Sequence, residues 1–215
     1  MEIYPGVVHI PQMFVNMYLV VGAQGLLLVD CGLKGSKGRI ADAARQAGKS
    51  LADLRTIVIT HADGDHYGGL DDLQQASRAA TWAAPAEAEA IRKGVSSRAL
   101  KPRGVYRLLY GLVAPVVKSK PGRIDSLLAE GQEFDFLGGL QALATPGHTP
   151  EHTSLWSPST GVLFAGDSIQ VADGQPRPSG GGNTWDAAKA VESFERQMAL
   201  KPVLILAGHG IWKAQ

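Results

Sequence analysis

The segment at residues 60–69 concentrates side chains that can bind metal ions. It reads THADGDHYGG, so four potential ligands fall within six residues: His61, Asp63, Asp65 and His66. Two carboxylates so close together are costly to bury unless a cation neutralises them. Glycines at positions 64, 68 and 69 allow the backbone to turn tightly and to aim alternate side chains at one point. The segment therefore predicts a metal site.

Three other segments place a polar residue directly after an apolar strand and next to glycine. They are the PGHT segment with His148, the Gly-Asp pair that ends at Asp167, and the Gly-His-Gly segment around His209. A binding site at the carboxyl ends of strands requires this arrangement. Each motif alone carries little information, but the four segments together indicate one shared site.

The elements that must position these residues begin as strands followed by a helix. Apolar runs at 15–21 and 26–29, separated by a turn at 22–25, predict a hairpin. Ser36 can cap a helix that ends at Gly48. The apolar face of that helix is formed by Ile40, Ala43, Ala44 and Ala47. The β-branched run at 56–59 predicts a buried strand that delivers His61 at its carboxyl end.

The second half of the chain repeats this pattern. Strands are expected at 133–145, 152–156, 162–165 and 203–207, and a helix is expected at 186–200. That helix is expected to pack through Ala187, Val191, Phe194 and Met198. Two strand-rich units, each closed by helices, predict two sheets packed face to face with helices outside.

Residues from about 85 to 123 interrupt the pattern. Between Arg92 and Arg123 this stretch holds nine Lys or Arg residues and no acid. Its amphipathic part carries Val105, Leu108, Leu109, Leu112 and Val113. We interpret it as a basic, partly helical insertion in one domain that spans residues 1–215. Its charges could form a lid that attracts an anionic substrate, or a solvated face whose apolar side supports a homodimer, and the solvated face is favoured.

The order of the site motifs resembles the metallo-β-lactamase superfamily. A strand, His-x-x-x-Asp-His-x-Gly-Gly, Pro-Gly-His-Thr, Gly-Asp and Gly-His-Gly follow one another over nearly the whole chain, and the later half is closest to the glyoxalase II-like hydrolases. The resemblance implies a four-layer αββα sandwich with metals at one edge between the sheets. It implies a first metal at His61, Asp63 and His148, a second at Asp65, His66 and His209, a bridge at Asp167, and an outer acid at Asp30.

One position departs from the family pattern. The family usually has histidine where this sequence has Asp63. A carboxylate is a good metal ligand, and it makes the site harder and more negative, which favours Mn²⁺ or Fe²⁺, although zinc also fits. The alternative is that Asp63 leaves the first metal weakly held and gives a mononuclear or inactive site.

The resemblance implies a metal-dependent hydrolase with two divalent ions. A metal-bridged hydroxide would attack a carbonyl carbon or a phosphorus atom, and the ions would stabilise the charge that develops on oxygen. Asp65 is the candidate for orienting the nucleophile and moving its proton. The leading hypothesis is cleavage of an ester, thioester, lactone or related bond. Alternatives in the same superfamily are a mononuclear iron oxygenase of the persulfide dioxygenase type and a diiron redox or sensor protein.

Three further residues could lie near a substrate. Tyr67 could hydrogen-bond a substrate or pack in the core. His152 could face the cleft or be structural. Ser168, which follows Asp167, could line the mouth of the site together with Gln170.

The composition argues against several other classes of protein. A net charge of +1 gives no reason to expect a nucleic-acid-binding or membrane surface. The single cysteine, Cys31, cannot form an intrachain disulfide, which fits a reducing compartment. The sequence shows no secretory signal and no apolar run of about 18 residues or more. We therefore expect a cytoplasmic protein that acts on a small molecule, with an anionic molecule as one option.

Overall fold

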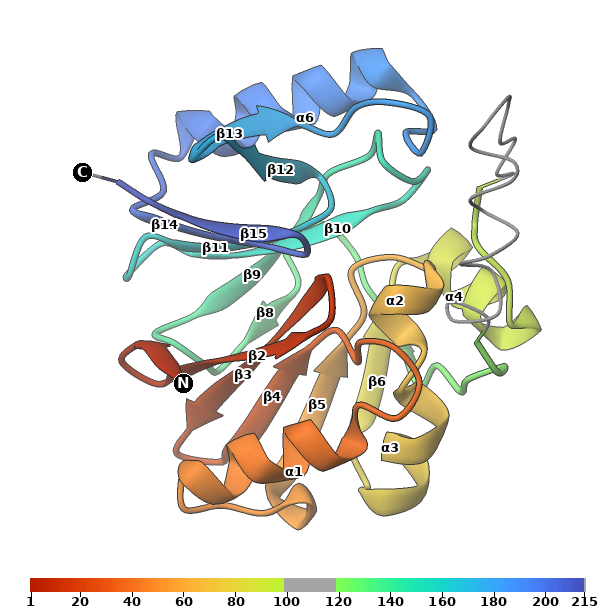
Figure 1. The fold of residues 1–215 in the computed structure, drawn as a ribbon, viewed down its shortest axis with the longest axis vertical. Helices are drawn as coiled ribbons and strands as arrows, with labels where there is room; N and C mark the ends of the chain where they lie inside the picture. The colour runs from red at the N-terminus through yellow and green to blue at the C-terminus, as the bar shows by residue number, and fades with distance from the viewer. Residues whose placement is uncertain (99–118, 215) are drawn as a thin grey trace.

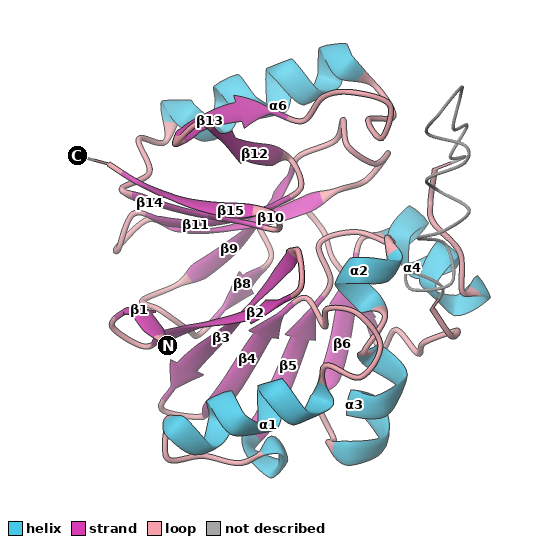
Figure 2. Ribbon diagram, viewed as in Figure 1, coloured by secondary structure: helices cyan, strands magenta, loops and turns pink. Residues whose placement is uncertain are grey.

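Two β-sheets lie face to face, and helices cover the outer side of each sheet (Figure 1). This arrangement comes from a computed structural model that describes residues 1–98 and 119–214. Figure 2 shows the four layers in the order helix, sheet, sheet, helix, and each half of the sequence supplies one sheet. The predicted αββα sandwich is confirmed.

The first sheet has seven strands in chain order. They are β1 (Glu2–Tyr4), β2 (Val7–Gln12), β3 (Val15–Gly22), β4 (Gly25–Val29), β5 (Leu54–Val58), β6 (Ala80–Ala83) and β7 (Ser126–Leu127). Strands β3 and β4 form the predicted antiparallel hairpin, with Gly22 opposite Gly25. Strands β4 to β7 run parallel, so their carboxyl ends meet at one edge. The helical elements of this half are α1 (Lys37–Gln46), the 3₁₀ turn η1 (Leu51–Asp53), α2 (Gly64–Tyr67), α3 (Leu70–Ala76) and α4 (Pro85–Lys93).

The second sheet has six strands in the order β15-β14-β11-β10-β9-β8. These strands are β8 (Glu133–Phe134), β9 (Leu140–Ala144), β10 (Thr153–Ser157), β11 (Val162–Gly166), β14 (Leu204–Ala207) and β15 (Gly210–Lys213). A separate hairpin of β12 (Ile169–Ala172) and β13 (Gln175–Pro178) lies between this sheet and α6 (Ala187–Ala199). The expected strand at 133–145 is divided into β8 and β9 by a break at Gly138 and Gly139.

Successive side chains of the buried strands point to opposite faces of the sheet, which explains how each sheet packs against the layers on both sides. In β4, Leu26 and Leu28 face the helices of the first half, whereas Leu27 and Val29 face the second sheet. Strand β11 does the same, since Phe164 packs between the sheets and its neighbours pack against α6. A strand that is buried on both faces must be apolar at every position, and both strands read as continuous apolar runs.

Two details of helix packing differ from the prediction. The Ser36 hydroxyl donates to the Cys31 carbonyl at 2.5 Å and makes no capping bond to α1. In α6 the buried face is formed by Ala190, Ser193 and Gln197, while Val191 is 43 % exposed. The predicted face at Ala187 and Val191 is therefore wrong, although Phe194 and Met198 do pack against the second sheet. A pattern based on apolar residues cannot anticipate buried polar side chains that are satisfied by hydrogen bonds.

The stretch at about 85–123 begins with an ordinary helix of the first half. Helix α4 buries Glu87, Ala88, Ala90 and Ile91. The amphipathic segment from Val105 to Val113 lies outside the described residues. None of the helices that the structure describes is long and apolar enough to span a membrane.

Candidate metal centre

The first predicted set of ligands is brought together at the edge between the two sheets. Its members are His61, Asp63 and His148, whose ligand atoms all lie within 4.8 Å of one another. The Asp63 Oδ2 atom lies 3.5 Å from His61 Nε2 and 3.3 Å from His148 Nε2. All three side chains are wholly or largely buried.

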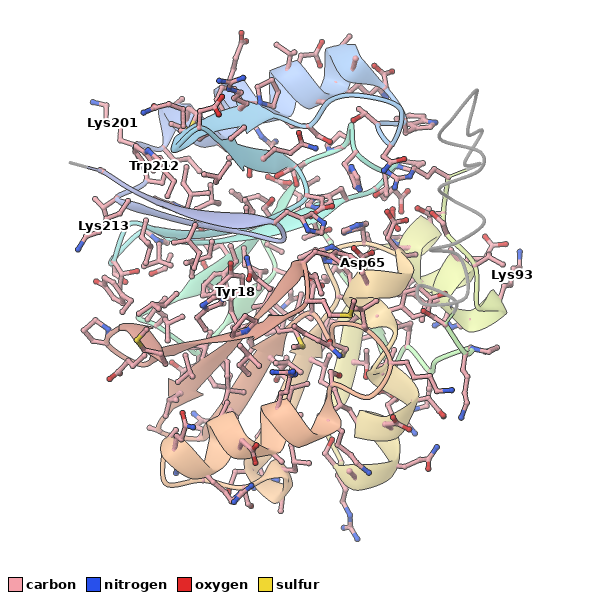
Figure 3. All side chains as sticks on the ribbon, in the orientation of Figure 1. Tyr18, Asp65, Lys93, Lys201, Trp212 and Lys213 are labelled. Atoms are coloured by element: carbon pink, nitrogen blue, oxygen red, sulfur yellow. The ribbon has the colours of Figure 1, made fainter. Side chains whose placement is uncertain are left out.

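The second predicted set lies directly beside the first. Asp65, His66 and His209 also have ligand atoms within 4.8 Å of one another. The Asp65 Oδ2 atom is 4.0 Å from His66 Nε2 and 3.6 Å from His209 Nε2. Figure 3 shows Asp65, a residue of α2, at the level where the two halves of the molecule meet.

Asp167 lies between the two sets and reaches both. Its Oδ1 atom is 3.4 Å from His66 Nε2. Its Oδ2 atom is 3.5 Å from His148 Nε2 and 3.2 Å from His209 Nε2. One carboxylate thus touches ligands of each set, which is the arrangement that a bridging ligand requires.

The site residues come from turns that follow neighbouring strands. His61 follows β5, His148 follows β9, Asp167 follows β11 and His209 follows β14. Gly208 leaves the space that the site needs, because a Cβ atom there would collide with Asp167 Oδ1 and the His66 ring.

The first sheet also holds the turn that carries His209. The Tyr18 hydroxyl donates to the Ala207 carbonyl at 2.7 Å, and the backbone N–H of Asn16 donates to the Gly208 carbonyl at 2.9 Å. Figure 3 shows Tyr18 between the two sheets. The turn after β14 is therefore fixed by contacts between the layers.

Each of the four histidines directs its Nε2 atom to the centre, because its Nδ1 atom has another partner. The partner is Thr60 Oγ1 for His61 at 3.0 Å, Asp30 Oδ2 for His66 at 2.8 Å, Ser179 Oγ for His148 at 3.0 Å, and the Phe14 carbonyl for His209 at 2.7 Å. A carboxylate or a carbonyl oxygen accepts, so Nδ1 of His66 and of His209 donates. A neutral ring then keeps its lone pair on Nε2, as in metal-binding histidines.

Unsatisfied atoms support a cation at this centre. The buried His61 Nε2, His66 Nε2 and Asp167 Oδ1 atoms have no hydrogen-bond partner. Buried polar atoms are rarely left in that state, and a missing ion is one ordinary explanation. Imidazole nitrogens combined with carboxylate oxygens are a donor set for zinc, iron or manganese. The residues present therefore fit one or more divalent metal ions.

The electrostatics of the site favour ionised carboxylates. Burial alone would raise the pKa of the Asp63 carboxyl, but its contacts with the imidazoles of His148 and His61 and with the Arg98 guanidinium hold it well below its usual range. At Asp167, burial is likewise outweighed, and the positive charges of neighbouring imidazoles keep the pKa low. Burial lowers the pKa of His148 to about 4. At His209 the Asp167 carboxylate outweighs burial and raises the pKa to about 9.

Two of the residues expected around the ligands hold ligand residues in place. Asp30 lies behind His66, and its Oδ1 atom also accepts from the Thr60 backbone N–H at 2.8 Å, so it holds the imidazole in place. His152 is a positioning residue, because its Nε2 atom accepts from the Asp167 backbone N–H at 3.0 Å and its Nδ1 atom contacts Thr145 Oγ1.

Tyr67 and Ser168 are both buried in the structure. Tyr67 packs in the core of the first half, and its hydroxyl donates to the Val95 carbonyl at 3.3 Å. Ser168 is 1 % exposed, and its hydroxyl donates to the Ala165 carbonyl at 2.7 Å and contacts Gln197. The expectation that Ser168 lines the mouth is therefore wrong, because its side chain points toward α6.

Two charged residues at the site were not anticipated. Glu87 of α4 accepts from the Ala62 backbone N–H at 2.7 Å and from the Thr149 hydroxyl at 2.7 Å, so it ties two ligand-bearing segments together. Arg98 contacts Asp63 and His148 directly. No local pattern distinguishes Glu87 in an alanine-rich helix or Arg98 in a basic stretch, since only the fold brings them to the centre.

Comparisons with known proteins identify the family. The model of the metallo-beta-lactamase superfamily matches residues 10–209, and the chain belongs to this superfamily. YobT of Bacillus subtilis (strain 168) is 32 % identical over 93 % of this chain and 85 % of its own length. The Probable metallo-hydrolase YflN of the same organism is 30 % identical over 86 % of this chain and 75 % of its own length.

Two further similarities concern part of the chain and the fold. A hydroxyacylglutathione hydrolase of Pseudomonas putida (strain GB-1) is 33 % identical over 55 % of this chain and 35 % of its own length, which confirms the likeness to glyoxalase II-like hydrolases. A solved metallo-beta-lactamase from Cronobacter sakazakii superposes with a TM-score of 0.71 at 26 % identity, over 98 % of this chain and 79 % of the other.

Proposed function

We propose that this protein is a metal-dependent hydrolase that cleaves an ester, thioester, lactone or related bond in a small molecule. The observation that carries the proposal is the pair of ligand sets that share Asp167. Such a centre suits two divalent ions. The chemistry that the ions supply when bound is activation of water and stabilisation of negative charge on the substrate oxygen.

The residues of the chain have distinct parts in this proposal. Asp65 is the ligand best suited to orient a water molecule and to accept its proton, because its side chain is 16 % exposed whereas the neighbouring His66 is fully buried. Asp30 and the Phe14 carbonyl keep His66 and His209 oriented toward the centre. No serine or cysteine nucleophile is required, and Cys31 is buried in the core of the first half.

The relatives support hydrolysis. YflN is named as a probable metallo-hydrolase and the Pseudomonas putida relative as a hydroxyacylglutathione hydrolase. Neither name describes an oxygenase or a redox protein. We therefore place hydrolysis before the mononuclear iron oxygenase and the diiron redox protein.

The test combines metal analysis with a panel of substrates. Protein purified without added metal is analysed for zinc, iron and manganese per chain, and is then assayed with p-nitrophenyl esters, acyl thioesters, lactones and a phosphodiester. We expect metal-dependent turnover of at least one acyl substrate and loss of turnover in Asp65→Asn. About one iron per chain with oxygen consumption on a persulfide, and no hydrolysis, would replace this proposal with the oxygenase.

A further inference from the structure

Arg98 lies buried against the first ligand set. Its side chain is 5 % exposed, and its Nη2 atom donates to Asp63 Oδ2. Its Nη1 atom donates to His148 Nε2 at 3.0 Å and to the His148 carbonyl at 2.8 Å, and it also contacts the Asn183 carbonyl. Among the residues that the structure describes, no other arginine or lysine is buried.

The short segment before Arg98 is fastened to the same place. The Ser96 hydroxyl donates to Asp63 Oδ1 at 2.7 Å, and the Tyr67 hydroxyl donates to the Val95 carbonyl at 3.3 Å. Both oxygens of Asp63 are therefore engaged by residues 96 and 98. This accounts for the aspartate at a position where the family usually has histidine, since a carboxylate pairs with a guanidinium and a serine hydroxyl at once.

The contact with His148 excludes a metal ion at the same atom. A neutral imidazole has one lone pair, on the ring nitrogen that carries no proton. Nε2 of His148 lies 3.0 Å from Arg98 Nη1 and 3.3 Å from Asp63 Oδ2. A guanidinium can only donate, so in the neutral tautomer that carries its proton on Nδ1, beside Ser179, Arg98 faces the lone pair of Nε2. A metal ion would need the same lone pair. A guanidinium and a divalent cation in contact with one carboxylate oxygen would also repel each other strongly in a buried site.

The second ligand set has no such competitor. Within residues 1–98 and 119–214, no arginine or lysine forms an ion pair with Asp65 or Asp167. Nε2 of His66 and of His209 lies against the carboxylates of Asp65 and Asp167, which a divalent ion would bind together with the two imidazoles.

We propose that Arg98 and a metal ion compete for the first set, so that the two sets fill in a fixed order. The second set, with Asp167, takes a divalent ion first. The first set takes one only when the guanidinium leaves Asp63 and His148. This inference rests on the proposed metal centre, and it is independent of the bond that the protein cleaves.

Titration of metal-free protein with zinc tests the order of filling. We expect the wild-type protein to bind one equivalent tightly and the second at least about tenfold more weakly, because the second ion must displace charge-assisted hydrogen bonds. In Arg98→Met the second equivalent should bind about tenfold or more tightly than in the wild type. Arg123→Met is the control, because Arg123 is exposed and pairs with Asp125; it should titrate like the wild type.

The outcomes separate this inference from the proposed metal centre. Two equally tight equivalents in the wild type, unchanged in Arg98→Met, would overturn the competition while leaving the centre intact. No binding in any folded variant would overturn the metal centre itself.

A second measurement covers the case in which Arg98→Met does not fold. The side-chain nitrogen resonances of Arg98 in the wild-type protein can be followed by NMR during the zinc titration and assigned with Arg98→Lys. They should stay unchanged up to one equivalent and shift with the second. A shift that is complete at the first equivalent would contradict the proposed order.

Discussion

The two ligand sets are equal in composition and unequal in surroundings. Each contains two histidines and one aspartate. The aspartate of the first set, Asp63, is bonded to Arg98 and Ser96. In the second set, the histidines are supported from behind by Asp30 and the Phe14 carbonyl. The first set thus faces a guanidinium, whereas in the described part of the chain the second set forms ion pairs only among its own residues and Asp167.

This contrast shows that ligand identity alone does not fix metal occupancy. Affinity for a metal depends on which partners orient the ligands and on what the metal must displace. At the second set, Nε2 of His66 and of His209 lies against carboxylates, whereas at the first set a guanidinium already contacts Nε2 of His148. Four variants test this contrast between the two sets.

Asp167→Ala should have the largest effect, because it removes the carboxylate that both sets share. We expect loss of most bound metal. The metal affinity should fall at least about 100-fold, which exceeds the usual cost of losing a residue that only hydrogen-bonds a metal ligand. Turnover should fall with it. Elemental analysis after dialysis measures the metal, and Asp173→Ala, at an exposed acid on the β12–β13 hairpin, is the control. Near-normal metal content in Asp167→Ala would rule out a shared bridging ligand.

Gly208→Ala should affect the second set most strongly. The new methyl group would meet Asp167 Oδ1 and the His66 ring. We expect the tight zinc equivalent to be weakened about tenfold or more, since an outer-shell disturbance costs 10- to 100-fold. Gly182→Ala is the matched control, because a Cβ atom there meets nothing within 4 Å. If zinc titration shows the tight equivalent unchanged in Gly208→Ala, the second set is not the tight site.

Asp63→His should change the metal preference of the first set. It replaces a hard carboxylate with imidazole and removes the ion-pair partner of Arg98. We expect retention of zinc relative to manganese or iron to rise by about tenfold. Competition dialysis against mixed metals measures the ratio. A preference that does not change would mean that Asp63 is not a ligand in the loaded protein.

The strands could be predicted from local patterns, whereas the assignment of candidate ligands to two metals came from the resemblance to the metallo-β-lactamase superfamily. Continuous apolar runs at 26–29 and 162–165 predict strands buried on both faces, and the structure places β4 and β11 there. The motifs that carry the seven candidate ligands each follow a strand, so strand prediction brings them to one edge. The spacing of potential ligands within residues 61–66 predicted a metal site because it, too, is a local pattern.

The surroundings of the ligands could not be read in this way. Arg98 meets Asp63 across 35 positions and His148 across 50, and no periodicity connects them. Ser168 follows Asp167 directly, yet its hydroxyl bonds toward Ala165 and Gln197 and not toward the mouth. Which side of a turn a polar residue faces depends on the hydrogen bonds that it finds after folding.

Ser96→Ala should have the smallest effect and the most specific one. It removes a single hydrogen bond, from the Ser96 hydroxyl to Asp63 Oδ1, and leaves Arg98 in place. A hydrogen bond to a charged group contributes about 1.5 kcal/mol or more, so the second zinc equivalent should bind a few-fold to about tenfold more tightly. The tight equivalent should not change, because in the described part of the chain residues 96–98 form no hydrogen bond or ion pair with Asp65, His66 or His209. Tighter binding of both equivalents in a zinc titration would mean that the two sets are coupled through Asp167 and do not fill independently.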